Sequence, residues 1–280
     1  MTRADEFLSN VITWATRDAC VRRLLLVGSR ARTTPLDDLA DFDLQVYVET
    51  NERYTQDQDW LSAIGRIWVC VPDEYSDGDI QVPTRLVIFD GGMKVDFAFY
   101  PVGHVSTGVS AGLPYRILLD KDLAGGPHGT TSVQWKQRPV PNELAFRRLV
   151  EEFWFEAYHV AKYLARKELW LAKSRDWATK RFLLTMIDWH EQIARGRVHE
   201  VNCVGQRSCV SPDTWEALYR TFGAFEREES WRAALATMSL FRRLAAEVAA
   251  TARFTYPTDV DRNISEFILR LRDAGQDAQT

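Results

Sequence analysis

The chain changes character near its middle, where a segment rich in glycine and proline separates two different patterns of apolar residues. Before that segment, short apolar stretches alternate with turn residues, which predicts a mixture of strands and helices. After Asn142 prolines become rare, and apolar residues recur at spacings of three and four, as in an amphipathic helix. The segment from Ala124 to Pro141 therefore reads as a linker. We expect two domains, at residues 1–138 and 139–280.

The first half predicts a helix near 4–18, a helix or bend near 57–63, and strands near 22–28, 43–49, 65–71, 84–90 and 93–100. The second half predicts one long helix from Glu143 to about Ala172, capped by Asn142, and helices near 176–196, 212–224, 229–252 and 260–273. These helices need one another to bury their apolar stripes. The predicted fold class is α+β: an N-terminal domain with a mixed β-sheet flanked by helices, followed by a C-terminal α-helical bundle.

The first half also contains a Gly-Ser turn and a pair of aspartates. Gly28 and Ser29 follow one apolar strand, and Asp41 and Asp43 open the next. Side chains two residues apart on a strand point to the same face, so the two carboxylates should converge. Mg²⁺ is commonly held by one or two carboxylates together with substrate phosphates. Each motif alone is common in solvated turns, but their order resembles the arrangement in nucleotidyltransferases of the DNA polymerase beta type, and this resemblance implies transfer of a nucleotidyl group.

A third aspartate follows a predicted hairpin. Residues 90–92, Asp-Gly-Gly, are a strong hairpin signal, and Asp96 falls among apolar residues of the returning strand. We expect Asp96 to lie beside Asp41 and Asp43 on a shared sheet, as a ligand of a second ion or as a general base. The predicted catalytic and metal-binding residues are these three aspartates, and two Mg²⁺ ions are expected.

Composition argues against several classes of protein. The formal net charge of −4 argues against a nucleic-acid-binding surface and suits a cationic acceptor. No apolar stretch approaches the roughly 20 residues needed to span a bilayer, and the charged N-terminus leads into a helical pattern, not a signal peptide. The 4 cysteines form no Cys-x-x-Cys pair, so neither a disulfide framework nor zinc is expected. We expect a cytoplasmic monomer or weak homodimer that binds neither nucleic acid nor membrane.

Taken together, the motifs along the chain resemble those of the aminoglycoside 6-adenylyltransferases, also called streptomycin adenylyltransferases. The other matching segments cover nearly the whole chain: Trp60-Leu61, Val71-Pro72-Asp73-Glu74, Phe89-Asp90-Gly91, Val95-Asp96, Leu119-Asp120-Lys121-Asp122, Glu152-Phe153-Trp154, Val160-Ala161-Lys162 and Tyr256-Pro257. The Gly-Ser and Asp-x-Asp motifs alone specify only the wider nucleotidyltransferase superfamily of the DNA polymerase beta type. The chain departs from the family at Ala98, where a threonine is frequent, and at Gly92-Met93-Lys94, where members vary.

The resemblance implies Mg²⁺-dependent transfer of AMP from ATP to a hydroxyl of a streptomycin-like aminoglycoside, at the 6-position. Pyrophosphate would be released and the antibiotic inactivated. The N-terminal domain would be catalytic and the helical domain would bind the substrate. Two alternatives stay open: a nucleotidyltransferase acting on a lincosamide or a protein hydroxyl, and a non-catalytic nucleotide-binding regulatory module. Desolvated carboxylates are costly to keep without a metal, which argues against the regulatory module.

Further residues are predicted to bind the two substrates. Gly28 and Ser29 would let the backbone approach the triphosphate, and Arg30 would contact phosphate. By resemblance to related nucleotidyltransferases, Lys162 of the helical domain would reach the nucleotide phosphates.

Three side chains share one stripe of the long predicted helix, at spacings of four and three: Glu152, Glu156 and His159. They would line an acidic acceptor pocket, although a solvated helix face is the alternative reading. Most tryptophans of the helical half are expected to pack between helices, and one or two to stack on adenine or on a sugar ring; they include Trp154, Trp170, Trp177 and Trp189.

Overall fold

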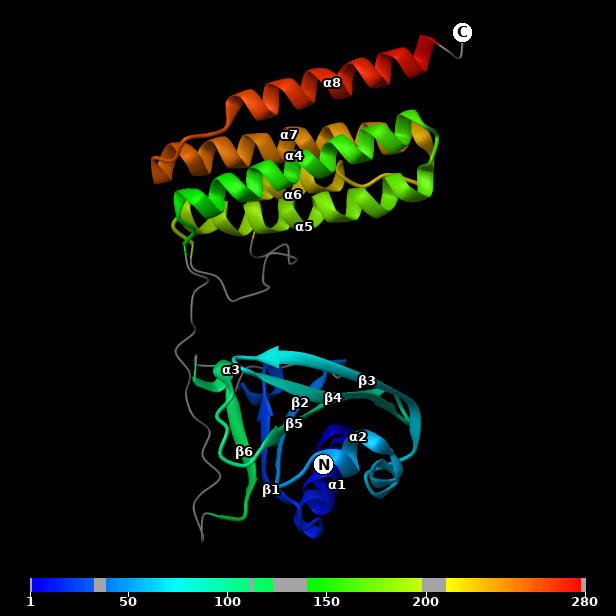
Figure 1. The fold of residues 1–280 in the computed structure, drawn as a ribbon, viewed down its shortest axis with the longest axis vertical. Coiled ribbons are helices and arrows are strands. Elements are labelled where there is room, and N and C mark those ends of the chain that lie inside the picture. Colours follow the sequence, from blue (N-terminus) through cyan, green and yellow to red (C-terminus); the bar gives the residue numbers. More distant parts are fainter. Residues whose placement is uncertain (1, 33–38, 111–112, 123–139, 198–209, 278–280) are drawn as a thin grey trace. The chain divides into compact units, whose positions relative to one another are not determined.

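The computed structural model describes residues 2–32, 39–110, 113–122, 140–197 and 210–277. The chain divides into two compact units, Met1–Lys136 and Gln137–Thr280, whose ribbons are drawn in Figure 1. The predicted linker, apart from Val140 and Pro141, and the predicted domain boundary after residue 138 fall outside the described residues.

The first unit is a six-stranded sheet with helices. Its elements are α1 (Arg3–Arg17), β1 (Val21–Val27), the 3-10 helix η1 (Ser29–Ala31), β2 (Phe42–Val48), α2 (Glu52–Gln56), the 3-10 helix η2 (Asp59–Ala63), β3 (Ile67–Asp77), β4 (Ile80–Phe89), β5 (Met93–Pro101), α3 (Thr107–Ser110) and β6 (Tyr115–Asp120). The strand order is β3-β4-β5-β2-β1-β6. Neighbouring strands are antiparallel except β2 and β5, which are parallel, so the predicted mixed sheet is confirmed.

The two edge strands differ from the sequence prediction. β3 continues to Asp77, beyond the predicted end at residue 71, and β6 was not predicted at all. The physical reason is the same for both. The side chains of β3 are mostly exposed and those of β6 are half-buried along its whole length, so neither strand shows clear alternation of apolar and polar residues.

The sheet buries one face more completely than the other. On the covered face, Phe7, Trp14 and Tyr54 from α1 and α2 pack against Phe97 and Phe99. A smaller cluster on the opposite face includes Tyr47, Ala98 and Tyr100. Because side chains alternate along a strand, Asp43 of β2 and Asp96 of β5 project from this second, less covered face.

The second unit is a bundle of helices that lie side by side in Figure 1: α4 (Glu143–Ala165), α5 (Leu169–Ile193), α6 (Pro212–Tyr219), α7 (Arg227–Ala252) and α8 (Thr258–Asp277). Its core includes Phe153 of α4 and Phe241 of α7, whose rings stack with centroids 3.6 Å apart. The α+β fold class, with a helical second half, is therefore confirmed. None of the described helices is both long and apolar enough to cross a lipid bilayer.

The prediction of one helix from Glu143 to about Ala172 is wrong at its C-terminal end. Asn142 does cap the helix, because its Oδ1 accepts a hydrogen bond from the backbone N–H of Ala145 at 2.8 Å. However, α4 ends at Ala165 and α5 starts at Leu169. The chain turns at Lys167, whose φ of 62° lies in the left-handed region normally used by glycine at helix ends. With no glycine or proline at the turn, the sequence pattern gave no stop signal.

Candidate active site

The parallel pair β2–β5 brings two of the predicted aspartates side by side. Asp43 is directly paired with Asp96, and Phe42 is paired with Val95. Asp41 lies one residue before β2, at the same end of the two strands. The register therefore gathers the three predicted carboxylates at one edge of the less covered face of the sheet.

A lysine that sequence analysis did not select joins two of these carboxylates. The Nζ of Lys94 lies 2.7 Å from Oδ2 of Asp41. The same atom lies 3.0 Å and 3.1 Å from Oδ1 and Oδ2 of Asp96. The side chains are partly exposed, at 39% for Lys94, 42% for Asp41 and 29% for Asp96, so these charges are accessible to a solute. Lys94 and Asp96 are two residues apart on β5, which is the spacing that places both on one face.

The charges of this cluster perturb one another. Burial raises the pKa of Asp43, and repulsion from Asp96 and Asp41 raises it further, while Lys94 acts in the opposite direction. Partial burial alone would lower the pKa of Lys94, but its hydrogen bonds with Asp41 and Asp96 outweigh that effect and raise it. The three carboxylates thus form one electrostatic unit with Lys94 as counter-ion.

The donor set of this cluster suits a divalent cation in its chemistry. Carboxylate oxygens are the hard ligands that Mg²⁺ prefers, and the oxygens of Asp41 and Asp96 already surround one positively charged group. Within the described parts of the chain, no group of three or more His, Cys, Asp or Glu side chains forms a ready metal site. Asp41 and Asp96 would hold an ion once Lys94 moves away, with Asp43 beside them. The metal assignment of the three aspartates therefore stays a prediction.

Gly28 forms the tight turn between β1 and η1, next to the aspartates. Its φ is 71°, and its N–H donates to the carbonyl of Pro114 at 3.0 Å. A Cβ at this position would lie 2.5 Å from Oδ2 of Asp43, so only glycine leaves room for that carboxylate. Ser29 follows as the first residue of η1. The geometry explains why a glycine stands here, whereas the predicted contact of both residues with phosphate stays a prediction.

Arg30 makes contacts that position the start of β2. Its Nε donates to the carbonyl of Ala40 at 2.7 Å, and its guanidinium carbon lies 4.1 Å from the centroid of the Phe42 ring. These contacts hold the chain on both sides of Asp41. The structure thus gives Arg30 a positioning role, and its predicted contact with phosphate stays a prediction.

The residues predicted to bind the acceptor all lie on α4, in the helical unit. Glu152 pairs with Arg148 at 2.8 Å, one turn earlier on the same helix. Glu156 pairs with Arg175 of α5 at 3.1 Å. The ring of His159 contacts the backbone carbonyl of Phe155 through Nδ1 at 2.8 Å. Both glutamates therefore already have cationic partners.

A hollow of about 500 Å³ on the surface of the helical unit contains two of these residues. It is lined by Glu151, Glu152, Phe155, Glu156 and Phe182. Phe155 is 62% exposed, and its ring is in edge contact with the ring of His159, with centroids 4.6 Å apart. His159 is not among the lining residues. The predicted nucleotide ligand Lys162 lies on the same helix, with its Nζ 6.0 Å from the centroid of the Tyr163 ring.

The tryptophans of the helical unit divide into packed and exposed ones. Trp154 is fully buried and Trp189 is half-buried, as expected for packing between helices. Trp170 and Trp177 of α5 are instead 78% and 64% exposed, whereas Trp215 is half-buried and Trp231 is buried, so most tryptophans of the described helices pack, as expected. Both exposed tryptophans lie on the outward side of α5, and Trp170 is in edge contact with Phe225, with ring centroids 6.2 Å apart.

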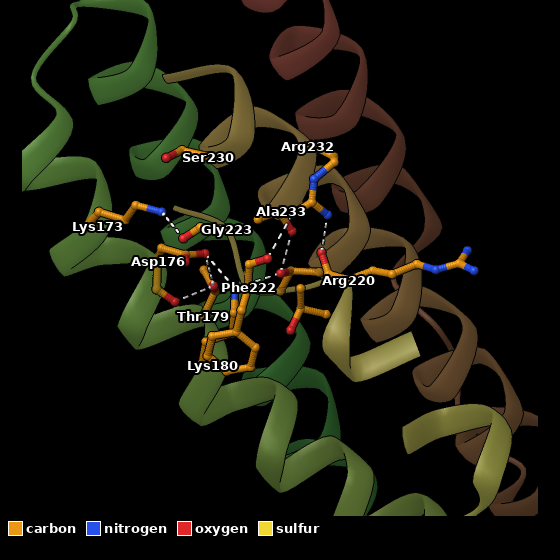
Figure 2. Close-up of polar contacts among 12 residues, drawn as sticks. Lys173, Asp176, Thr179, Lys180, Arg220, Phe222, Gly223, Ser230, Arg232 and Ala233 are labelled. Carbon is orange, nitrogen blue, oxygen red and sulfur yellow. Dashed lines mark hydrogen bonds and ion pairs between the residues drawn. The ribbon is translucent and has the colours of Figure 1, made fainter. Parts of the chain in front are cut away.

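A buried ion pair inside the helical unit was also missed from sequence. The Nζ of Lys180 donates to Oδ1 of Asp176 at 2.7 Å and to the hydroxyl of Thr237 at 2.8 Å, and its side chain is only 7% exposed. Figure 2 shows Lys180 and Asp176 on one helix. Lys173 lies about one turn before Asp176 and donates to the carbonyl of Gly223. The spacing of four between Asp176 and Lys180 was the available signal, but it is equally typical of solvated pairs.

The chain is similar to known proteins along nearly its whole length. The model of the streptomycin adenylyltransferase family matches residues 1–271. An aminoglycoside 6-adenylyltransferase of Campylobacter jejuni is 28% identical over 279 residues, covering 96% of each chain. A protein of the same name from Bacillus subtilis (strain 168) is 27% identical over 282 residues, covering 95% of this chain and 97% of the relative. A crystal structure of an aminoglycoside 6-adenyltransferase from Bacillus subtilis is 20% identical, with a TM-score of 0.48 over 97% of this chain and 99% of that one.

The resemblance inferred from the motifs is thus confirmed by a match that spans nearly the full length of the chain. With its predicted aspartates gathered on one edge of a mixed sheet, this chain is an enzyme that belongs to the streptomycin adenylyltransferase family.

Proposed function

We propose that the enzyme transfers AMP from ATP to a hydroxyl of an aminoglycoside of the streptomycin type, at the 6-position, and so inactivates the antibiotic. The observation that carries this proposal is the pairing of Asp43 with Asp96, with Asp41 linked to Asp96 through Lys94. The names of the relatives, aminoglycoside 6-adenylyltransferase, support both the acceptor and the position.

The chemistry gives the cluster two tasks, metal binding and proton transfer. Asp41 and Asp96, with Asp43 beside them, would hold a divalent cation such as Mg²⁺, which when bound would neutralise charge on the phosphate oxygens. Asp96 takes the proton of the acceptor hydroxyl while the oxygen of that hydroxyl forms a bond to the α-phosphorus of ATP. The bond from that phosphorus to the bridging oxygen breaks, and pyrophosphate leaves with its electron pair. Because Gly28 carries no side chain, the carboxylate of Asp43 has room beside the turn.

The acidic hollow on α4 supports a cationic acceptor. Its glutamates carry negative charge on a surface that also offers the exposed ring of Phe155, and aminoglycosides combine cationic groups with sugar rings. The arginine partners of Glu151 and Glu152 lie on the surface, where such pairs contribute only about 0–1 kcal/mol. A polycationic ligand can therefore replace those arginines at small cost.

The test is release of pyrophosphate from ATP and Mg²⁺ across a panel of aminoglycosides and lincosamides. We expect release with streptomycin and a product that carries AMP on the 6-hydroxyl, identified by mass spectrometry and NMR. Release with a lincosamide alone would replace the proposed acceptor. If neither pyrophosphate release with any small acceptor nor AMP transfer to a protein is detected, the result would instead support a regulatory module.

Replacing Gly28 with alanine is expected to lower the rate of AMP transfer about a hundredfold, because the new Cβ would push Asp43 out of position and displacements of about 1 Å cost that much. The matched control is Gly92→Ala in the hairpin between β4 and β5. Gly92 also has a positive φ, 79°, but its Cβ would meet nothing within 4 Å. Both variants should lose stability from backbone strain, and only Gly28→Ala should lose activity; equal activity in the two variants would refute the steric argument.

A further inference from the structure

The ammonium group of Lys94 occupies the carboxylate oxygens that a metal ion would bind. Its ammonium donates to Oδ2 of Asp41 and to both oxygens of Asp96, so it engages the same oxygen atoms that a divalent cation would need. A metal ion and this ammonium cannot share those atoms at these distances. Binding of a cation between Asp41 and Asp96 therefore requires Lys94 to move.

Lys94 is well suited to such a movement. Its side chain is 39% exposed and has a flexible four-carbon stem, so the ammonium can leave the carboxylates without disturbing the core. Its own strand position is fixed, because β5 is paired on both sides, with β2 and with β4. Without a cation between them, the carboxylates of Asp41 and Asp96 would repel each other and Asp43, which makes a resident counter-ion favourable.

We propose that Lys94 is a built-in competitor of the metal: its ammonium holds Asp41 and Asp96 together in the metal-free protein and must leave them before a divalent cation binds. The inference rests on the proposed function in so far as it concerns the same carboxylates. Lys94 acts through Asp41 and Asp96, so it is a positioning residue that sets the apparent affinity of the site for metal.

The experiment is titration of the full-length, metal-free protein with Mn²⁺, a cation suited to carboxylate ligands, followed by calorimetry and by the paramagnetic resonance of free Mn²⁺. Lys94→Met should bind Mn²⁺ about tenfold more tightly than the wild type, since two partly exposed ion pairs no longer have to be broken. Lys94→Gln should behave in the same way, which guards against a folding defect of one variant. Lys94→Arg keeps the charge and should stay within about threefold of the wild type.

The matched control is Lys121→Met in the same unit, because the Nζ of Lys121 donates to the backbone carbonyl of Asp18 and, among the described residues, to none of the three aspartates. The Mn²⁺ affinity of this variant should equal that of the wild type. Equal or weaker Mn²⁺ binding by Lys94→Met and Lys94→Gln would overturn the inference, as would no Mn²⁺ binding by any variant. Because the titration contains neither ATP nor acceptor, its result is separate from the pyrophosphate assay. If the wild type turns over ATP but the Lys94 variants bind Mn²⁺ with unchanged affinity, only the role of Lys94 is refuted. If the Lys94 variants bind Mn²⁺ more tightly but the wild type shows no turnover, only the proposed function is refuted.

Discussion

Replacing Asp43 with asparagine is expected to lower the rate of AMP transfer about a thousandfold or more while the protein stays folded. Asp43 is paired with Asp96 in the β2–β5 ladder and lies beside the turn at Gly28, so its carboxylate is central to the cluster. Asparagine has nearly the same size but lacks the charge that would bind a cation. The measurement is kcat for pyrophosphate release with ATP, Mg²⁺ and the preferred aminoglycoside.

The same substitution should not lower stability at neutral pH. Burial, with repulsion from Asp96 and Asp41, raises the pKa of Asp43 in the folded protein. The folded state therefore binds this proton more tightly than the unfolded state, and stability falls as pH rises from the unfolded pKa through the folded pKa. Asparagine does not ionise, so the melting temperature of Asp43→Asn at neutral pH should equal or exceed that of the wild type. A lower melting temperature would assign the loss of activity to misfolding instead.

A control aspartate lies in the same unit. Asp90, in the turn between β4 and β5, is exposed, and the contact made by Arg3 is with its backbone carbonyl. Asp90→Asn should keep kcat close to the wild-type value. Transfer by Asp43→Asn at a rate within tenfold of the wild type would contradict the proposed role of the cluster.

The parts of the fold that could be predicted are those where burial imposes a pattern. β2 and β5 are central strands with a buried face, and their apolar residues made both strands predictable. The approach of Asp96 to Asp43 was predicted from the order of the motifs along the chain, not from the local pattern. The Asp-Gly-Gly segment predicted the hairpin because glycine readily adopts the positive φ that such turns require, and Gly91 and Gly92 both have positive φ in the structure. The α4 start was predictable because Asn142 satisfies the backbone of the first turn.

The features that were missed lack such a pattern. The edge strand β3 is largely exposed, and the turn at Lys167 uses a left-handed lysine instead of glycine. Lys94 was within reach, since a Lys-x-Asp spacing on a strand puts both charges on one face. Its bond to Asp41 depends on the parallel pairing of β2 with β5, which joins segments far apart in sequence, and local pattern does not encode such a contact.

Replacing Lys180 with methionine is expected to destabilise the helical unit by about 3 kcal/mol, the lower part of the range for breaking a buried ion pair. Methionine fills a similar volume but leaves the carboxylate of Asp176, whose side chain is 17% exposed, without its main cationic partner, and it removes the donor to Thr237. The measurement is urea unfolding of the full chain followed by the helical circular dichroism signal, with an unchanged m-value as the check on two-state behaviour.

Lys173→Met is the matched control on the same helix. Lys173 is half-buried and donates to one backbone carbonyl, that of Gly223, so its loss should cost no more than about 1.5 kcal/mol. The double variant Asp176→Leu with Lys180→Met should be more stable than Lys180→Met alone, because removing both charges leaves no uncompensated carboxylate. If the double variant is less stable than the single one, Asp176 stabilises the bundle independently of Lys180, and the ion pair is not the source of the effect.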